Sequence, residues 1–152
     1  MGREGEEKLR YCFTQGPEYE EMARMLERWQ EDPSAVKEAF LRLGAFLAER
    51  KGARLSFKAR PGVSYSLRAA KPSGVEGGER LFALVDVIDD PNARYLSVCF
   101  YEETVTDPEG LGETIPGGIL GEDGYCFTVE ENDPVLLSYL ERRVLEAAGE
   151  ED

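Results

Sequence analysis

The sequence predicts an α+β fold: a single antiparallel sheet of about five strands, with two N-terminal helices and one C-terminal helix packed mainly on one face. Two observations support this prediction. Apolar residues recur at helical spacing near both ends of the chain, and they alternate with polar residues in the middle. Short turns between the alternating segments favour antiparallel pairing. The 152 residues fit one domain, 1–152, with loose termini expected at 1–16 and 148–152.

Three helices are expected from apolar spacing and from residues typical of helix ends. The first spans 17–30. The second begins at Asp32-Pro33, because Asp caps free N–H groups and Pro fits the first helical position, and Gly52 is expected to end it. A second Asp-Pro pair at 133–134 gives the same signal for the third helix.

Alternation of apolar and polar residues predicts the strands. They are expected at 54–60, 63–69, 81–88, 95–101 and 125–129. Pro61-Gly62 is a tight-turn signal between the first two strands, and Asp123-Gly124 is a hairpin signal before the last. The stretch 103–124 is long for a loop in a compact domain, and we expect it to cover the polar face of the sheet.

Charge is distributed unevenly along the chain. The net charge of −13 opposes binding to nucleic acid or to an anionic membrane, so neither partner is expected. Residues 50–80 nevertheless hold eight basic and two acidic residues, a local charge of +6, whereas the remainder holds 10 basic and 29 acidic residues. The sequence therefore predicts a basic hairpin embedded in an acidic protein.

Several chemistries are excluded by composition. The chain has no histidine, which removes His-based triads, Cys-His dyads and His-containing zinc sites. Its three cysteines lack CxxC spacing, and their odd number does not suggest a secreted disulfide framework. No metal site and no cofactor is expected. The N-terminus has no signal-peptide core and no apolar run approaches membrane-spanning length, so we expect a cytoplasmic protein.

The polar face of the predicted strands is the candidate binding surface. Alternation places Lys58, Arg60 and Arg68 on this face, where Arg suits bidentate contacts with carboxylate or phosphate. Asp86 is the one charged residue of a central apolar strand and shares the parity of Phe82 and Leu84. The predicted ligand-binding residues are Lys58, Arg60, Arg68, Asp86 and Tyr101. The simpler alternative is a solvated face whose charges pair locally, with Asp86 bound to Arg60 or Arg68.

Three functions remain open from the sequence. The first is a non-catalytic binding or regulatory module that holds an anionic ligand or an acidic partner segment on this face. The second is a small enzyme with Asp86 as general base or Cys99 as nucleophile, although Cys99 and Cys126 also fit small half-buried hydrophobes. The third is a homodimer whose basic hairpin meets an acidic surface. The absence of histidine and of any cofactor fingerprint favours the first and third over an enzyme.

Overall fold

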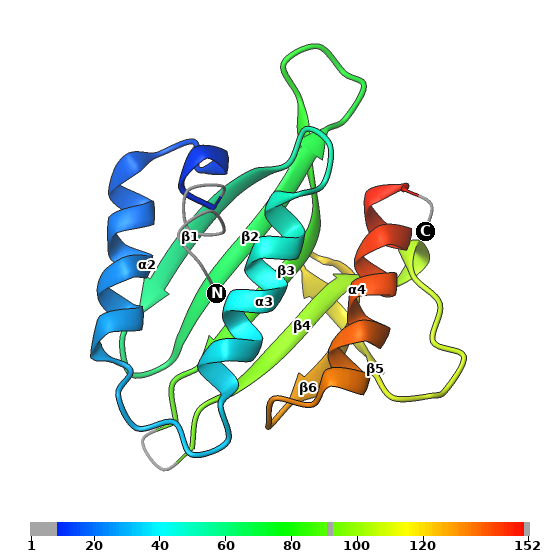
Figure 1. Cartoon of the computed structure of the whole chain (residues 1–152). Coiled ribbons are helices and arrows are strands. Elements are labelled where there is room, and N and C mark those ends of the chain that lie inside the picture. The colour runs from blue at the N-terminus through cyan, green and yellow to red at the C-terminus, as the bar shows by residue number, and fades with distance from the viewer. Residues whose placement is uncertain (1–8, 91–92, 151–152) are drawn as a thin grey trace.

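The computed structural model describes residues 9–90 and 93–150, in which three long helices lie on one face of a six-stranded sheet (Figure 1). All neighbouring strands are antiparallel, in the order β1-β2-β3-β4-β6-β5. The predicted fold class is confirmed, with six strands where about five were expected. The elements are α2 (Gly16–Arg28), α3 (Val36–Ala48), β1 (Arg54–Arg60), β2 (Ser64–Pro72), β3 (Glu79–Ile88), β4 (Tyr95–Tyr101), the short 3-10 helix η1 (Glu102–Thr104), β5 (Glu113–Ile119), β6 (Glu122–Val129) and α4 (Pro134–Ala148).

The helices divide the sheet between them. α2 packs on β1, α3 crosses the middle strands β2, β3 and β4, and α4 lies on β3 beside α3 (Figure 1). No described helix covers the opposite face, which we call the uncovered face. Among the described residues no helix combines the length and the apolar character needed to cross a membrane.

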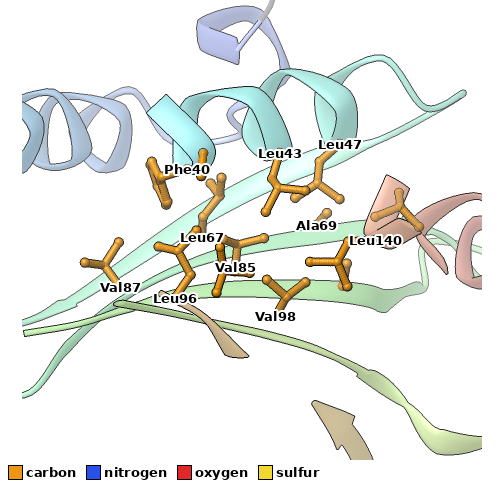
Figure 2. Close-up of a cluster of buried hydrophobic side chains, with 14 of the residues drawn as sticks. Phe40, Leu43, Leu47, Leu67, Ala69, Val85, Val87, Leu96, Val98 and Leu140 are labelled. Atoms are coloured by element: carbon orange, nitrogen blue, oxygen red, sulfur yellow. The ribbon is translucent and has the colours of Figure 1, made fainter. Parts of the chain in front are cut away.

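The core lies between α3 and the sheet. Phe40, Leu43 and Leu47 follow one another at helical spacing and point onto strand side chains such as Leu67 and Val85 (Figure 2). All five are at most 1% exposed. Burying each large side chain contributes about 1.5–3 kcal/mol, so this stripe is the main reason α3 docks on the sheet. Truncating Leu43 to Ala would cost about 2–5 kcal/mol.

The predicted start of the second helix is wrong by three residues. α3 begins at Val36, and the preceding Ala35 adopts a left-handed conformation with φ of 56°. Asp32 nevertheless caps the helix from a distance, because its carboxylate accepts the N–H groups of Val36 and Lys37 at 2.9 Å each. The turn that contains Pro33 therefore lies before the helix rather than inside it.

Of the other two helix-end predictions, the one for Asp133 is confirmed and the one for Gly52 is wrong. Asp133 caps α4 as predicted and accepts the N–H of Val135 at 3.0 Å. Gly52 was expected to end the second helix, but α3 ends at Ala48. Gly52 instead has φ of +70° in the turn that leads into β1, a conformation that favours glycine.

The predicted long loop contains the sixth strand. Within 103–124, residues Glu113–Ile119 form β5, which pairs with β6 at the edge of the sheet. The hairpin turn is Leu120-Gly121, whose φ angles are 49° and 86°, and not Asp123-Gly124, which lie in β6. Period-two alternation could not reveal β5, since the strand is almost entirely exposed and has no apolar face.

The described part of the N-terminal segment packs against the sheet rather than hanging loose. Leu9 is 3% exposed and belongs to the core. The N–H of Thr14 donates to the carbonyl of Leu55 at 3.3 Å, beside a short parallel bridge from Phe13 to β1. Residues 1–8 of the expected loose terminus lie outside the described residues.

The C-terminal end is held by charge pairs. Glu150 binds Arg50 at 3.0 Å and Lys71 at 3.3 Å, so the chain directly after α4 is held to β2 and to the turn that follows α3. Residues 151–152, the last of the expected loose terminus at 148–152, lie outside the described residues.

Candidate functional site: the uncovered sheet face

The strand register gathers the predicted site residues on the uncovered face. Lys58 is the cross-strand partner of Ser66, Ser66 of Asp86, and Asp86 of Ser97. Partners in an antiparallel ladder project to the same side, so these four side chains form one row across the sheet. Two further basic residues flank the row: Arg60 opposes Ser64 on one side of it, and Arg68 opposes Ser56 and Leu84 on the other.

Four cations on this face have no carboxylate partner among the described residues. They are Arg54, Lys58, Arg60 and Arg68, of which the first three are exposed. Three other cations of the basic segment, Arg50, Lys71 and Arg80, do form ion pairs. The alternative of a locally neutralised surface therefore holds for those three. Of the four that project from β1 and β2, Arg60 and Arg68 interact with the charge of Asp86 without forming an ion pair.

Asp86 is joined to Arg68 through a serine hydroxyl. Arg68 Nε donates to Ser66 Oγ at 3.2 Å, and the Ser66 hydroxyl is hydrogen-bonded to the Asp86 carboxylate. The expected direct ion pair of Asp86 with Arg60 or Arg68 does not form. Burial raises the pKa of Asp86, and the Ser66 hydrogen bond and the charges of Arg68 and Arg60 only partly oppose this effect. Asp86 Oδ1 is buried and has no hydrogen-bond partner within the described ranges.

Tyr101 lies on the same face but away from the four cations. Its ring is 4% exposed because the Arg80 guanidinium lies 4.2 Å above the ring centre and Ile119 packs in the same cluster. Arg80 is itself paired with Glu103 at 3.0 Å and with Glu122 at 3.5 Å. A ligand held by Arg60 and Arg68 would therefore not reach the Tyr101 ring without displacing Arg80.

Two of the three cysteines meet on the uncovered face. Cys99 on β4 and Cys126 on β6 are direct cross-strand partners and form a disulfide. The sulfur of Cys12 donates instead to the carbonyl of Ala48 at 3.3 Å. Sequence parity placed both paired cysteines on the polar side, but nothing in their spacing identified them as partners. A disulfide sulfur is not a thiolate, so the hypothesis of a Cys99 nucleophile requires the bond to be reduced first.

A half-buried carboxylate that sequence reasoning missed fixes the loop before β5. Asp107 accepts hydrogen bonds from the hydroxyls of Tyr125 and Tyr139, both at 2.5 Å, and from the N–H groups of Leu111 and Gly112. Burial alone would raise the pKa of Asp107, but these four donors hold it well below its ordinary range. Because Tyr139 belongs to α4, this loop lies toward that helix, and the prediction that it covers the polar face is wrong.

One shallow hollow is lined by Arg54 together with the loop from Pro72 to Glu79, and Lys58, Arg60 and Arg68 line none of the hollows described here. Two others lie away from all four cations. One is lined by Trp29, Asp32 and Arg94 at an end of the sheet, and another lies between α3 and α4 beside Phe46 and Glu141. Within the residues the structure describes, no group of three or more Asp, Glu, Cys or His side chains is placed to hold a metal ion.

Comparison with known proteins adds no family. The chain matches no protein-family model, no curated protein and no solved structure. The function therefore has to be argued from the chemistry of the uncovered face itself.

Proposed function

We propose that the protein is a non-catalytic binding module whose uncovered face holds an acidic segment of a partner protein. One observation carries the proposal: Arg54, Lys58, Arg60 and Arg68 project from β1 and β2 with no carboxylate partner among the described residues, in a chain of net charge −13. Like charges on one surface repel each other, and this repulsion is relieved when carboxylates of a partner approach.

The layout of the cations favours an extended segment over a compact ligand. Arg54, Lys58 and Arg60 lie on the same side of β1, at intervals of two or four residues. Every two residues of a strand span about 7 Å, and alternate side chains of an extended acidic peptide repeat at the same interval. Small-molecule sites are usually concave pockets, whereas these cations are spread over a broad sheet surface.

Asp86 has a positioning role in this proposal rather than a catalytic one. Its carboxylate holds the Ser66 hydroxyl, which in turn accepts from Arg68 Nε. The hydrogen bond of Nε fixes the orientation of the Arg68 guanidinium, and its remaining N–H groups are available to a partner. A raised pKa also suits a general base, but the buried Oδ1 atom lies beneath the surface that a substrate would reach.

Binding of a labelled oligoglutamate peptide, followed by fluorescence anisotropy, tests the proposal. The wild type, diluted until it is monomeric, should bind, and Arg60→Ala/Arg68→Ala should weaken binding about tenfold, since two partly exposed charge pairs of about 0.7 kcal/mol each are lost. The matched control is Arg24→Ala/Arg142→Ala, which removes two exposed cations from α2 and α4. Thermal unfolding verifies that each variant is folded.

The outcomes of this experiment, repeated with citrate in place of the peptide, distinguish the possible ligands. Selective loss in the sheet variant supports the proposal. Absence of binding by the diluted, monomeric wild type, or an equal loss in the helix control, contradicts it. Binding of citrate in place of the peptide would show that the same cations serve a small anion.

A further inference from the structure

The segments that form the two edges of the sheet differ in charge. Residues 54–68 contain the four cations and no acidic residue, whereas residues 102–130 contain eight acidic residues and no Lys or Arg. The eight are Glu102, Glu103, Asp107, Glu109, Glu113, Glu122, Asp123 and Glu130. The strand order places β1 and β2 along one edge of the sheet and β6 and β5 along the other. Three of the eight are already engaged, since Asp107 binds Tyr139 of α4 and both Glu103 and Glu122 pair with Arg80. The net charge of the two edge segments still has opposite sign.

Glu113 places an acidic side chain on the uncovered face itself. The register links Ser56 to Arg68, then to Leu84, Cys99, Cys126 and finally Glu113, so these residues form one row across all six strands. Glu113 is exposed and makes no ion pair within the described part of the chain. At the other end of the row, Arg54 and Lys58 lie on either side of Ser56.

The centre of the face is less polar than its edges. Leu84 and Ile88 of β3, Tyr95 of β4 and the disulfide between β4 and β6 are partly or largely buried although no described helix lies over them. An apolar centre with charged margins is the usual anatomy of a protein–protein interface.

We propose that this face is the interface of a symmetric homodimer, in which the β5–β6 edge of one copy supplies the acidic segment for the basic edge of the other. The inference rests on the proposed function, because it names a second copy of this chain as the partner of the same surface. The two-fold axis runs parallel to the strands, between β3 and β4, and lies in the plane where the two faces meet. It places each cross-strand row over the same row of the other copy, with β1 of one copy over β5 of the other and β2 over β6. Glu113 of the partner subunit then faces Ser56, with Arg54 and Lys58 on either side.

A two-fold axis can stack the uncovered faces of two copies in two orientations, parallel or perpendicular to the strands. The distribution of charge favours the parallel axis. An axis perpendicular to the strands would place β1 over its own copy and bring like charges together, which is unfavourable. The parallel axis brings opposite charges together along both edges at once. Packed sheets keep their strands within about 30° of each other, so the arrangement is an ordinary two-sheet sandwich.

The face is large enough for a stable dimer. Strands about 4.8 Å apart, with about seven residues each at 3.4 Å per residue, give a six-stranded face of roughly 650 Å² per copy. The pair would bury about 1,300 Å², which lies within the range of specific interfaces. Two chains of net charge −13 repel each other at long range, but physiological salt screens this repulsion beyond about 8 Å. The contacts between the edges are shorter than that distance.

Sedimentation equilibrium of complementary charge variants tests the dimer. The wild type should have twice the 17.0 kDa mass of one chain. Glu113→Lys and Arg54→Glu/Lys58→Glu should each weaken self-association at least a hundredfold, because each places like charges at both edges. An equimolar mixture of the two variants should form a dimer again, since one copy then brings Lys at 113 to the new acidic edge of the other. Recovery in the mixture cannot come from misfolded chains.

The matched control is Arg24→Glu/Arg142→Glu. Its two reversals each subtract two charges from −13, giving the same −17 as Arg54→Glu/Lys58→Glu, but on α2 and α4. It should remain dimeric. A monomeric wild type, variants that stay dimeric, or a mixture that stays monomeric would overturn the dimer.

A peptide experiment separates failure of the dimer from failure of the proposed function. Glu113→Lys keeps all four cations of the basic edge and, as a monomer, should bind oligoglutamate. If it is monomeric and does not bind, the proposed function fails. If the wild type is monomeric and binds the peptide through Arg60 and Arg68, only the dimer fails.

Discussion

Cys99 and Cys126 occupy opposed positions on β4 and β6, with their Cα atoms 4.2 Å apart and a disulfide between them. The two residues are separated by 27 positions in the chain, and the segment between them includes β5. The bond therefore ties the acidic edge of the sheet covalently to its centre.

Reduction of this disulfide should lower the free energy of unfolding by about 3 kcal/mol, because the bond restricts the unfolded chain over a loop of this length. Urea unfolding with and without a reductant measures the difference. Cys99→Ala/Cys126→Ala should not respond to the reductant, and Cys12→Ser should respond as the wild type does. Three reactive thiols in the unfolded protein before reduction would contradict the pairing.

Asp107→Asn should lower the pKa of Tyr125, which stands at about 12, toward its ordinary value. The hydrogen bond and the charge of the Asp107 carboxylate both stabilise the neutral phenol, and the substitution removes the charge. Phenolate absorbance in an alkaline titration measures the shift. Glu109→Gln removes a charge two positions away and should leave the titration of Tyr125 unchanged. An unchanged Tyr125 titration in Asp107→Asn would contradict this account.

The Asp107 carboxylate also makes the free energy of unfolding depend on pH in the acidic range. The pKa of Asp107 is lower in the folded than in the unfolded protein, so its ionised form stabilises the fold above its ordinary pKa of about 4. This contribution is lost as the pH falls below that value. The stability advantage of the wild type over Asp107→Asn should therefore shrink on acidification, and an advantage that grows would reverse the predicted sign.

Sequence alternation was sufficient to place Arg68 and Asp86 on one face, because the two-residue period of a strand fixes the side of each residue regardless of its neighbours. It failed at Phe82. A register shift opposite Ala69 and Ala70 moves Phe82 into the core, where it is 5% exposed, and brings Leu81 to the uncovered face. The β-bulge could not be predicted from the alternation of apolar and polar residues, because residues 81–85 of β3 are all apolar.

The sheet order was beyond the reach of the sequence for a different reason. β4 pairs with β6 rather than with β5, the next strand in the chain, and this choice brings Cys99 to Cys126. Pairing of strands that are not consecutive depends on tertiary packing. The edge strand β5 has no apolar face, so the period-two pattern used to predict strands does not detect it. The unpaired state of the cations on β1 likewise became visible only once their neighbours were known.

Asp86→Asn should stabilise the protein at neutral pH. Burial makes the folded pKa of Asp86 higher than the unfolded one, so the charged form is disfavoured in the fold at every pH above the folded pKa. The gain should disappear as the pH falls below about 4, where the wild-type carboxyl is protonated in both states. Chemical unfolding across this pH range measures it, with Glu27→Gln at an exposed position of α2 as the control that should not change. A less stable Asp86→Asn at neutral pH would show that the carboxylate contributes more through Ser66 than its burial costs.

Asp86→Asn should also bind an acidic segment less tightly. The substitution removes the charge that acts on Arg68 through the Ser66 hydroxyl, so the Arg68 guanidinium is held less firmly. Peptide anisotropy measures the affinity under the conditions used for the wild type. A stabilised protein with weakened binding is the expected pattern for a residue retained for function. Unchanged affinity would remove Asp86 from the site while leaving the role of the arginines intact.

Amide chemical-shift mapping of the monomeric Glu113→Lys variant with an added oligoglutamate peptide tests the central claim most directly, because it reports which surface the acidic segment meets. The account predicts saturable shifts on β1 and β2, centred on Arg54, Lys58, Arg60 and Arg68, with the exposed sides of α2 and α4 unaffected. Shifts confined to the helices, or no shifts at any peptide concentration, would contradict the assignment of the uncovered face as the binding surface.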